Sequence, residues 1–377
     1  MNKVFKIFSI ISFVILLFII GCQQKGKNDN YRIGAILPLT GPSSTLGELH
    51  KFGIDLAVEE INKKGGINGR KIEVLFEDSK NDSKTGIAAF NKLLNENVPA
   101  IISTFSNVSV PLASYMGTKE TQDLPVLLAT ATSAPNITKL SPKVFRAFII
   151  STDESKAIAE FLIKKNFKKV AIYYIEDDYG KGAQEVFKNI YENKAQNRNI
   201  VFSEAYRIGQ TDHRAAITKL KSTRPEIIFV VGYDRDFALA VRQIKENNIR
   251  AEIITTAPLS IPQNLEIVGN SEGIYLTASA YLTESTKELS QQFDEAFKMK
   301  YNKPSNYQSA STYLCLKLIA ESIKSKGYST KDIEEGLYMI KEFPSPLGKI
   351  SINQDREGSF QIVIKHIENG KLSDVKN

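Results

Sequence analysis

The chain has 377 residues, a length that suits two domains or one large unit divided into lobes. Hydrophobic residues make up 42% and charged residues 24%, which excludes a disordered or fibrous protein and allows sizeable cores. The formal charge is +7, and four lysines and Asp29 that precede residue 31 leave only +4 on the rest. Nucleic acid is therefore not an expected partner.

The first thirty residues differ in character from the rest. Two lysines precede an uncharged run over residues 7–20, which is shorter than the roughly 20 residues that a helix needs to span a bilayer. We interpret residues 1–21 as a secretory signal. The run ends in Gly21-Cys22, which resembles the bacterial lipobox and implies lipidation of Cys22; the alternative is a short buried helix with a chance cysteine. Residues 22–30 then form a flexible tether, and the body lies outside the cytoplasmic membrane, lipid-anchored in the periplasm or at the cell surface.

Cysteine and histidine indicate neither a disulfide framework nor a metal site. Once Cys22 is modified, Cys315 has no partner within the chain, and we expect it to be a small core residue on a helix. His50, His213 and His366 lack the spaced partners of a zinc site, so we expect surface residues there and no bound metal.

From residue 31 onward, short β-type runs alternate with helical patterns, which predicts parallel sheets covered by helices. Apolar residues recur at i, i+3, i+4 and i+7 from Ile54, from Ala183 and from Phe237, as amphipathic helices require. The predicted strands lie near 33–37, 72–76, 100–103 and 126–128, and then near 170–174, 201–206, 227–231, 253–255 and 273–278. A third block repeats neither series: helices near 286–301, 309–326 and 330–341, then extended runs at 348–352 and 359–366. This order predicts two lobes that share segments.

Two helix starts have recognisable caps. Ser151 and Glu154 have the spacing of a capping box, in which the side chains of the first residue and of the residue three further on bond reciprocally to the backbone. Asp212 can cap the helix that leads to Leu220. We therefore expect helices to begin at these two places.

Several motifs follow one another in a specific order: IGAILPLTGP at 33–42, KGGINGR at 64–70, VFR at 144–146, DYG at 178–180 and Gly232-Tyr233. Nearly all of the body resembles the leucine/isoleucine/valine type of substrate-binding protein of ABC transporters. The resemblance implies a type 1 periplasmic binding fold: two doubly wound α/β lobes joined by three crossing strands, with the ligand in the cleft. It implies that lobe 1 comprises residues 31–150 and 280–345, and lobe 2 residues 151–279 and 346–377. It also implies a monomer whose protein partner is an ABC permease in the membrane.

Two loops follow strands at the edge where open α/β sheets bind ligands. Residues 105–109 and 131–134 each combine hydroxyl groups with the start of a helical stretch, whose free amides and dipole favour a carboxylate. In the resembled family these loops bind the ligand carboxylate, which implies contacts from the hydroxyls of Ser106 and Ser133 and from the backbone of Ala131 and Ser133. Their loop neighbours Asn107 and Thr132 join the predicted site. The alternative is that these hydroxyls only cap helices.

The opposite wall of the predicted cleft is aromatic. Tyr179 and Tyr233 each follow a strand of the second lobe, so they are expected to face the ligand, unless they pack only at the rim. Leu46 stands where many relatives carry an aromatic or polar residue, and it makes its wall more apolar.

One residue expected from the resemblance is missing. Amino-acid-binding relatives carry an acidic residue after the strand near 253–255, where it pairs with the ligand's ammonium, but this chain has TAPL at 256–259. Because an unpaired buried ammonium costs several kcal/mol, either Asp178, Asp234 or Glu48 substitutes, or the ligand is an organic acid without an ammonium.

Three functions remain open. The first is a lipid-anchored protein that captures a small carboxylate or an amino acid for an ABC importer; the resemblance implies the branched-chain type. The second is a sensory module that signals to a receptor, and the third is an exported enzyme. No nucleophile with a base, phosphate loop or nucleophile elbow occurs, so neither catalysis nor a cofactor is expected.

Overall fold

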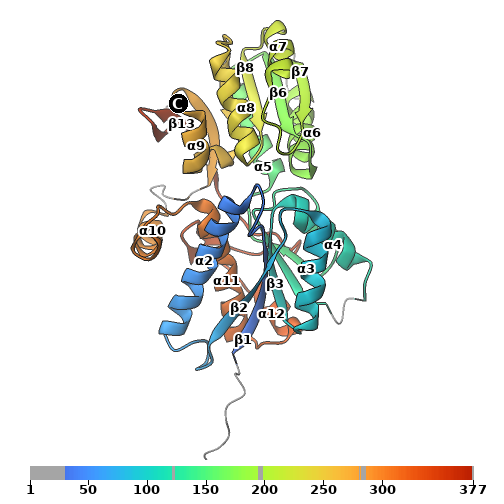
Figure 1. The fold of residues 1–377 in the computed structure, drawn as a ribbon, viewed down its shortest axis with the longest axis vertical. Coiled ribbons are helices and arrows are strands. Elements are labelled where there is room, and N and C mark those ends of the chain that lie inside the picture. Colours follow the sequence, from blue (N-terminus) through green and yellow to red (C-terminus); the bar gives the residue numbers. More distant parts are fainter. Residues whose placement is uncertain (1–29, 121–123, 194–197, 280, 282–285, 376–377) are drawn as a thin grey trace, which may run out of the picture.

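The computed structural model describes residues 30–120, 124–193, 198–279, 281 and 286–375, which form two α/β lobes stacked along the long axis (Figure 1). The predicted signal, Cys22 and most of the predicted tether lie outside these residues. Among the helices that are described, none combines the length and the apolar character that crossing a bilayer would require. The predicted α/β architecture with two lobes is confirmed.

The first lobe is built on a parallel sheet with the strand order β2-β1-β3-β4-β5 among the described residues. Its strands are β1 (Tyr31–Leu37), β2 (Ile72–Asp78), β3 (Ala100–Thr104), β4 (Val126–Thr130) and β5 (Val144–Arg146). Successive side chains of a strand point to opposite faces. In β1, Ala35 packs with the helices on one face and Ile36 with those on the other. Both faces are therefore covered, which explains the nearly unbroken apolar runs of these strands.

Helices from distant parts of the chain cover this sheet (Figure 1). They are α2 (Ser44–Lys63), α11 (Tyr307–Ser325) and α12 (Thr330–Tyr338) on one face, and α3 (Ser83–Asn95) and α4 (Ser106–Gly117) on the other. α2 and α11 pack closely because Gly53 has no side chain: a Cβ there would lie 2.1 Å from the carbonyl oxygen of Ser309. The hydroxyl of Thr312 donates to the carbonyl of His50 at the same contact (2.8 Å).

The second lobe has a mixed sheet with the strand order β14-β13-β10-β9-β8-β6-β7 in its described part. Its strands are β6 (Lys169–Ile175), β7 (Asn199–Tyr206), β8 (Ile227–Val231), β9 (Glu252–Thr255), β10 (Ile274–Ser279), β13 (Ile362–Glu368) and β14 (Lys371–Asp374). Its helices are α5 (Ser151–Lys164), α6 (Asp178–Asn193), α7 (Arg214–Ser222), α8 (Arg235–Glu246) and α9 (Pro262–Val268). Only β13 and β14 run antiparallel to their neighbours, so the C-terminal segment closes one edge of a parallel sheet.

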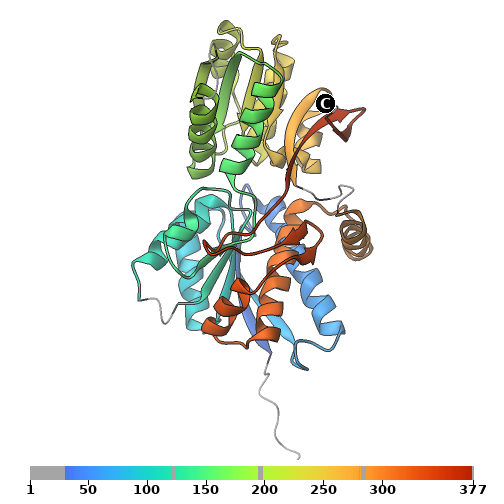
Figure 2. The same cartoon turned by 180° about the vertical axis from the view of Figure 1, so that it is seen from behind.

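The chain changes lobes after β5, after β10 and again between β12 and β13, and Figure 2 shows this last crossing in red. α10 (Lys287–Tyr301), β11 (Phe343–Ser345) and β12 (Gly348–Ile350) precede that crossing. β12 pairs with β11, and Glu357 forms an ion pair with Arg146 of the first lobe. The boundary expected at residue 346 is thus corrected to the stretch between Gly358 and Ile362, because these contacts hold the intervening segment on the first lobe.

Most predicted strands and helices are confirmed, and α7 begins where expected. The predicted cap at Asp212 is wrong by one position: His213 is the N-cap and makes no side-chain cap hydrogen bond, and Asp212 before it accepts a hydrogen bond from the amide of Arg214 (3.1 Å). Three short strands, β5, β11 and β14, were not predicted. The predicted capping box at Ser151 is wrong: Ile150 is the N-cap of α5, and the carboxylate of Glu154 points elsewhere, as described below. Cys315 is buried on α11, as predicted, and burial raises the pKa of its thiol to about 12.

The surface location predicted for the histidines is wrong for two of them. His50 and His213 are fully buried, and only His366 of the three is partly exposed. Burial lowers the pKa of His50 to about 3, so a neutral ring packs edge-on against Phe105 in the core. His213 shares a hydrogen bond of 2.8 Å with the hydroxyl of Tyr173.

Candidate functional site

A cavity lies where the two lobes meet. Both lobes and the first crossing segment contribute to its lining. The lining residues are Phe105, Ser106, Ala131, Ser133, Phe148, Ile149, Glu154, Tyr179, Tyr233, Ala257, Pro258, Tyr307 and Gln308. The cavity is therefore mostly apolar, with a few polar groups and one carboxylate among the residues that line it.

The first-lobe wall consists of two loops at the carboxyl ends of β3 and β4. Phe105 (φ 66°) and Ala131 (φ 48°) both have left-handed backbone conformations, which cost non-glycine residues free energy and cluster at functional sites. Phe105 is the N-cap of α4, so the first amides of that helix have no partner within it. The Ser106 hydroxyl accepts a hydrogen bond from the amide of Ala134 (3.1 Å), which ties one loop to the other and leaves its proton available. This wall can donate several hydrogen bonds to an anion.

The structure brings five of the eight predicted contact residues to the cavity: Ser106, Ala131, Ser133, Tyr179 and Tyr233. The other three lie away from its lining. Leu46 is buried in the core on α2. The Asn107 side chain donates to the carbonyl of Asn81 (2.6 Å), and the Thr132 hydroxyl is 3.0 Å from both the hydroxyl of Ser109 and the carbonyl of Thr130. Asn107 and Thr132 thus brace the loops, and we leave all three out of the contacts proposed below.

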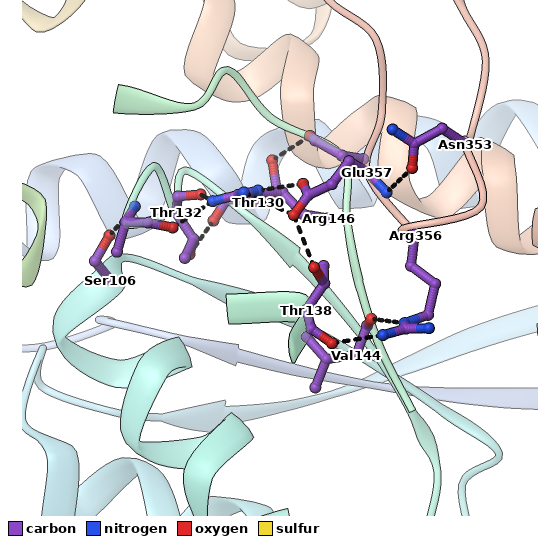
Figure 3. Close-up of polar contacts among 11 residues, drawn as sticks. Ser106, Thr130, Thr132, Thr138, Val144, Arg146, Asn353, Arg356 and Glu357 are labelled. Carbon is purple, nitrogen blue, oxygen red and sulfur yellow. Dashed lines mark hydrogen bonds and ion pairs between the residues drawn. The ribbon is translucent and has the colours of Figure 1, made fainter. Parts of the chain in front are cut away.

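A buried arginine supports the second loop from behind (Figure 3). Arg146, only 1% exposed, pairs with both carboxylate oxygens of Glu357 (2.6 and 2.7 Å). Its Nη1 donates to the carbonyls of Thr132 and Ala134. Holding these carbonyls behind the loop fixes the direction of the loop's amides, which is how a positioning residue shapes a site it does not touch.

Aromatic rings form most of the remaining wall. Phe105 of the first lobe stacks on Tyr233 of the second (centroids 5.7 Å apart), and Tyr179 packs edge-on against Tyr233 (5.8 Å). Phe148 from the crossing segment stacks on Tyr307 at the start of α11 (6.1 Å). Sequence reasoning missed Phe148, Tyr307 and Gln308 because they come from segments far apart in the chain, and no local pattern marked them.

The only carboxylate among the described lining residues belongs to Glu154 on α5, which was not among the acids considered from the sequence. Its Oε1 accepts hydrogen bonds from the Thr277 hydroxyl (2.6 Å) and from the amide of Ala257 (3.1 Å). It therefore reaches the end of β9, where no acidic residue was found. The suggested substitutes lie elsewhere: Asp178 is exposed, Asp234 accepts from Ser43 (2.7 Å), and Glu48 pairs with Lys303 (2.7 Å).

A second buried carboxylate, Asp177, fixes Tyr233 from outside the cavity. It accepts hydrogen bonds from the Tyr233 hydroxyl (2.9 Å) and from the amide of Gly180 (2.8 Å). Burial raises its pKa to about 6, although both hydrogen bonds act in the opposite direction. Ionised Asp177 is thus less favourable in the folded protein than in the unfolded chain.

This shift predicts how stability changes with pH. The unfolded carboxyl loses its proton near pH 4 and the folded one near pH 6, so stability is lost as pH rises through that window. Asp177→Asn removes the effect: its oxygen can still accept from the amide of Gly180, and its NH2 group can donate to the Tyr233 hydroxyl in place of the present bond. We expect the variant to gain about 3 kcal/mol relative to the wild type between pH 4 and pH 7 in urea unfolding. Asp178→Asn, at the exposed neighbour, is the control, and a pH-independent difference for Asp177→Asn would contradict the assignment.

The site offers binding groups without catalytic ones. Within the described part of the chain, no group of three or more metal-ligating side chains is found. The lining described here contains hydroxyls, aromatic rings, an amide and Glu154, but no basic residue and no nucleophile beside a base. Such a site can hold a small molecule with one anionic end.

Residues 30–371 match the family described as periplasmic binding protein. A Leu/Ile/Val-binding protein homolog 3 of Brucella melitensis is 28% identical over 330 residues, which are 85% of this chain and 87% of that protein. The branched-chain amino acid transporter substrate-binding protein LivJ of Streptococcus pneumoniae, solved with isoleucine, has a TM-score of 0.83 at 24% identity and covers 91% of this chain and 98% of its own. A solute-binding protein of R. palustris, solved with benzoate, has a TM-score of 0.81 at 18% identity, with coverages of 92% and 95%.

Proposed function

Because the chain belongs to the periplasmic binding protein family, we propose that it captures a small carboxylate, an amino acid of the branched-chain type, and passes it to the permease of an ABC importer. It is a substrate-binding protein and not an enzyme. Ligand contacts with both lobes favour the state in which the lobes meet, and this differential affinity drives hinge closure.

One observation carries the proposal: Ser106, at the start of α4, and Ser133 line one cavity together with the aromatic side chains of Phe105, Phe148, Tyr179, Tyr233 and Tyr307. The first-lobe loops suit a carboxylate, and the rings suit an apolar side chain. The names of relatives support branched-chain amino acids, whereas a structural neighbour with benzoate supports the alternative of a non-amino organic acid.

We propose in addition that the mature protein begins at Cys22 and is held at the membrane by acyl chains. The support is the order of basic start, apolar run and Gly21-Cys22 in the sequence. An anchor of two or three chains binds far more stably than one chain does.

The capture function is tested by a thermal-shift screen of residues 31–377 against amino acids, their deaminated acids, aromatic acids and simple amines. Ligands raise the melting temperature by mass action, and carboxylates are expected to do so. The proposal is falsified if amines without a carboxylate stabilise the protein and carboxylates do not.

Removing one proposed contact should weaken the best ligand of that screen. Ser133→Ala is expected to cost about 1 to 3 kcal/mol of binding free energy, because one carboxylate hydrogen bond stays unmet in a buried site. Stability without ligand should change little, since the Ser133 hydroxyl makes no hydrogen bond among the described residues. Calorimetric titration measures the loss. Ser222→Ala, on the exposed surface of α7, should leave the affinity unchanged; equal losses in both variants would speak against the contact.

A further inference from the structure

Glu154 is a buried carboxylate with no counter-charge. It is 2% exposed, and none of the ion pairs formed by the described residues includes it. The two groups that bond to its Oε1, Thr277 and the amide of Ala257, are neutral. Its nearest charged influence is Asp153, which has the same sign, and burial raises the pKa of Glu154. Buried carboxylates are normally paired with a cation, because taking a lone charge out of water is costly.

The cavity is the side from which a cation can reach this carboxylate. Glu154 lines the cavity, but no lysine, arginine or histidine appears among the lining residues. Two more polar groups at the cavity also lack partners among the described residues. The Tyr179 hydroxyl, although close to Thr256, makes no hydrogen bond of good geometry, and neither does the side-chain carbonyl of Gln308. Buried polar groups without partners are rare, and together they indicate a ligand that supplies donors.

The groups that favour an anion and the group that favours a cation lie on opposite lobes. The donors of Ser106 and Ser133 belong to the first lobe and favour an anion, whereas Glu154 belongs to the second lobe and favours a cation. A molecule that carries a carboxylate and an ammonium on the same carbon can satisfy both, and it does so only when the lobes meet. The aromatic rings that line the same cavity suit an apolar side chain of that molecule.

We propose that Glu154 receives the ammonium group of the ligand, so that this site selects α-amino acids over carboxylic acids of the same shape. The inference rests on the capture function proposed above and specifies the ligand class. The segment after β9 has no acidic side chain to pair with an ammonium. Glu154 of α5 can take that role, because its carboxylate bonds to the amide of Ala257 in this segment. An acid of this kind discriminates strongly, because a ligand without the ammonium leaves a carboxylate buried and unpaired.

The test compares Glu154→Gln with the wild type by calorimetric titration against leucine, isoleucine and valine and against their deaminated acids, such as 4-methylpentanoate. Gln keeps the shape and the oxygen that Thr277 and Ala257 bond to. We expect the variant to bind the amino acids on the order of a hundredfold more weakly, and the deaminated acids as well as or better than the wild type does. Asp153→Asn is the matched control, because it removes the same charge from the neighbouring, exposed position. It should change each affinity by no more than about twofold.

Each outcome bears on the inference separately from the capture function. If the wild type binds amino acids and Glu154→Gln binds them equally well, the role of Glu154 is refuted while capture stands. If the wild type binds only acids without an ammonium, the same conclusion follows. Binding of neither kind of carboxylate overturns both.

A second variant covers the case in which Glu154→Gln does not fold. The double replacement Glu154→Ala with Ala257→Glu moves the carboxylate to the end of β9, a neighbouring point of the same cavity wall. We expect it to bind amino acids at least tenfold more tightly than Glu154→Ala alone. Equal affinities of the two variants would count against an ammonium contact at this wall.

Discussion

Replacing Arg146 with methionine is expected to lower the free energy of unfolding by about 3 to 5 kcal/mol. Methionine fills similar space, but it leaves the Glu357 carboxylate, 13% exposed, without its cation. The carbonyls of Thr132 and Ala134 lose their donor as well. Because the chain contains no tryptophan, far-UV circular dichroism during urea unfolding is the appropriate measurement. Ligand affinity should also fall, since the loop of Ser133 loses its support.

An exposed pair with the same geometry provides the control. Arg214 also forms a fork to a carboxylate, that of Asp212, with distances of 2.9 and 2.6 Å, but its side chain is 80% exposed. Arg214→Met should cost less than about 1 kcal/mol and leave ligand binding unchanged. Similar losses for the two arginines would show that burial and loop contacts are not what makes Arg146 important.

Replacing Gly182 with alanine should reduce ligand affinity by about tenfold or more while leaving the protein equally or more stable. Gly182 lies on α6 of the second lobe, and a Cβ there would come within 2.6 Å of the Pro135 ring in the first lobe. The lobes could then approach less closely, and a ligand would lose contacts with one of them. Within α6 itself, alanine is favoured over glycine by roughly 0.5 to 1 kcal/mol. Affinity and stability should thus change in opposite directions.

Calorimetric titration and urea unfolding of the ligand-free protein separate these two effects. Lys181→Ala, at the exposed neighbouring position of α6, is the control and should change affinity little. If Gly182→Ala binds ligand as tightly as the wild type, the contact between Gly182 and Pro135 does not limit closure.

The sequence predicted elements well where periodicity extends over many residues. The long strands and helices appear within a few residues of their expected bounds, because a sheet covered on both faces requires continuous apolar runs. β5 and β11 have three residues each, too few to show a period. The antiparallel pairing of β13 depends on where the chain returns to the second lobe, which no local pattern records.

The site was harder to predict for a physical reason that Glu154 illustrates. A serine followed three residues later by glutamate is the pattern of a capping box. The same pattern also occurs where the glutamate makes its hydrogen bonds to residues far away in the sequence. In the fold, the amide of Ser151 donates to the carbonyl of Ser133 (2.8 Å), and Glu154 bonds to β10 and to the end of β9. Glu154 bonds to residues more than 100 positions away instead of forming a capping box. The sequence alone does not show which distant residues lie next to it in the fold.

The pairing of α2 with α11 also constrains when the protein can fold. The hydrogen bond between Thr312 and His50 spans 262 positions, so a growing polypeptide exposes the apolar stripe of α2 until most of its length has been synthesised. The second sheet likewise cannot be completed until β13, near the C-terminus, has been synthesised and pairs with β10. Neither lobe can therefore complete its sheet and its helical cover before the C-terminal segments have been synthesised.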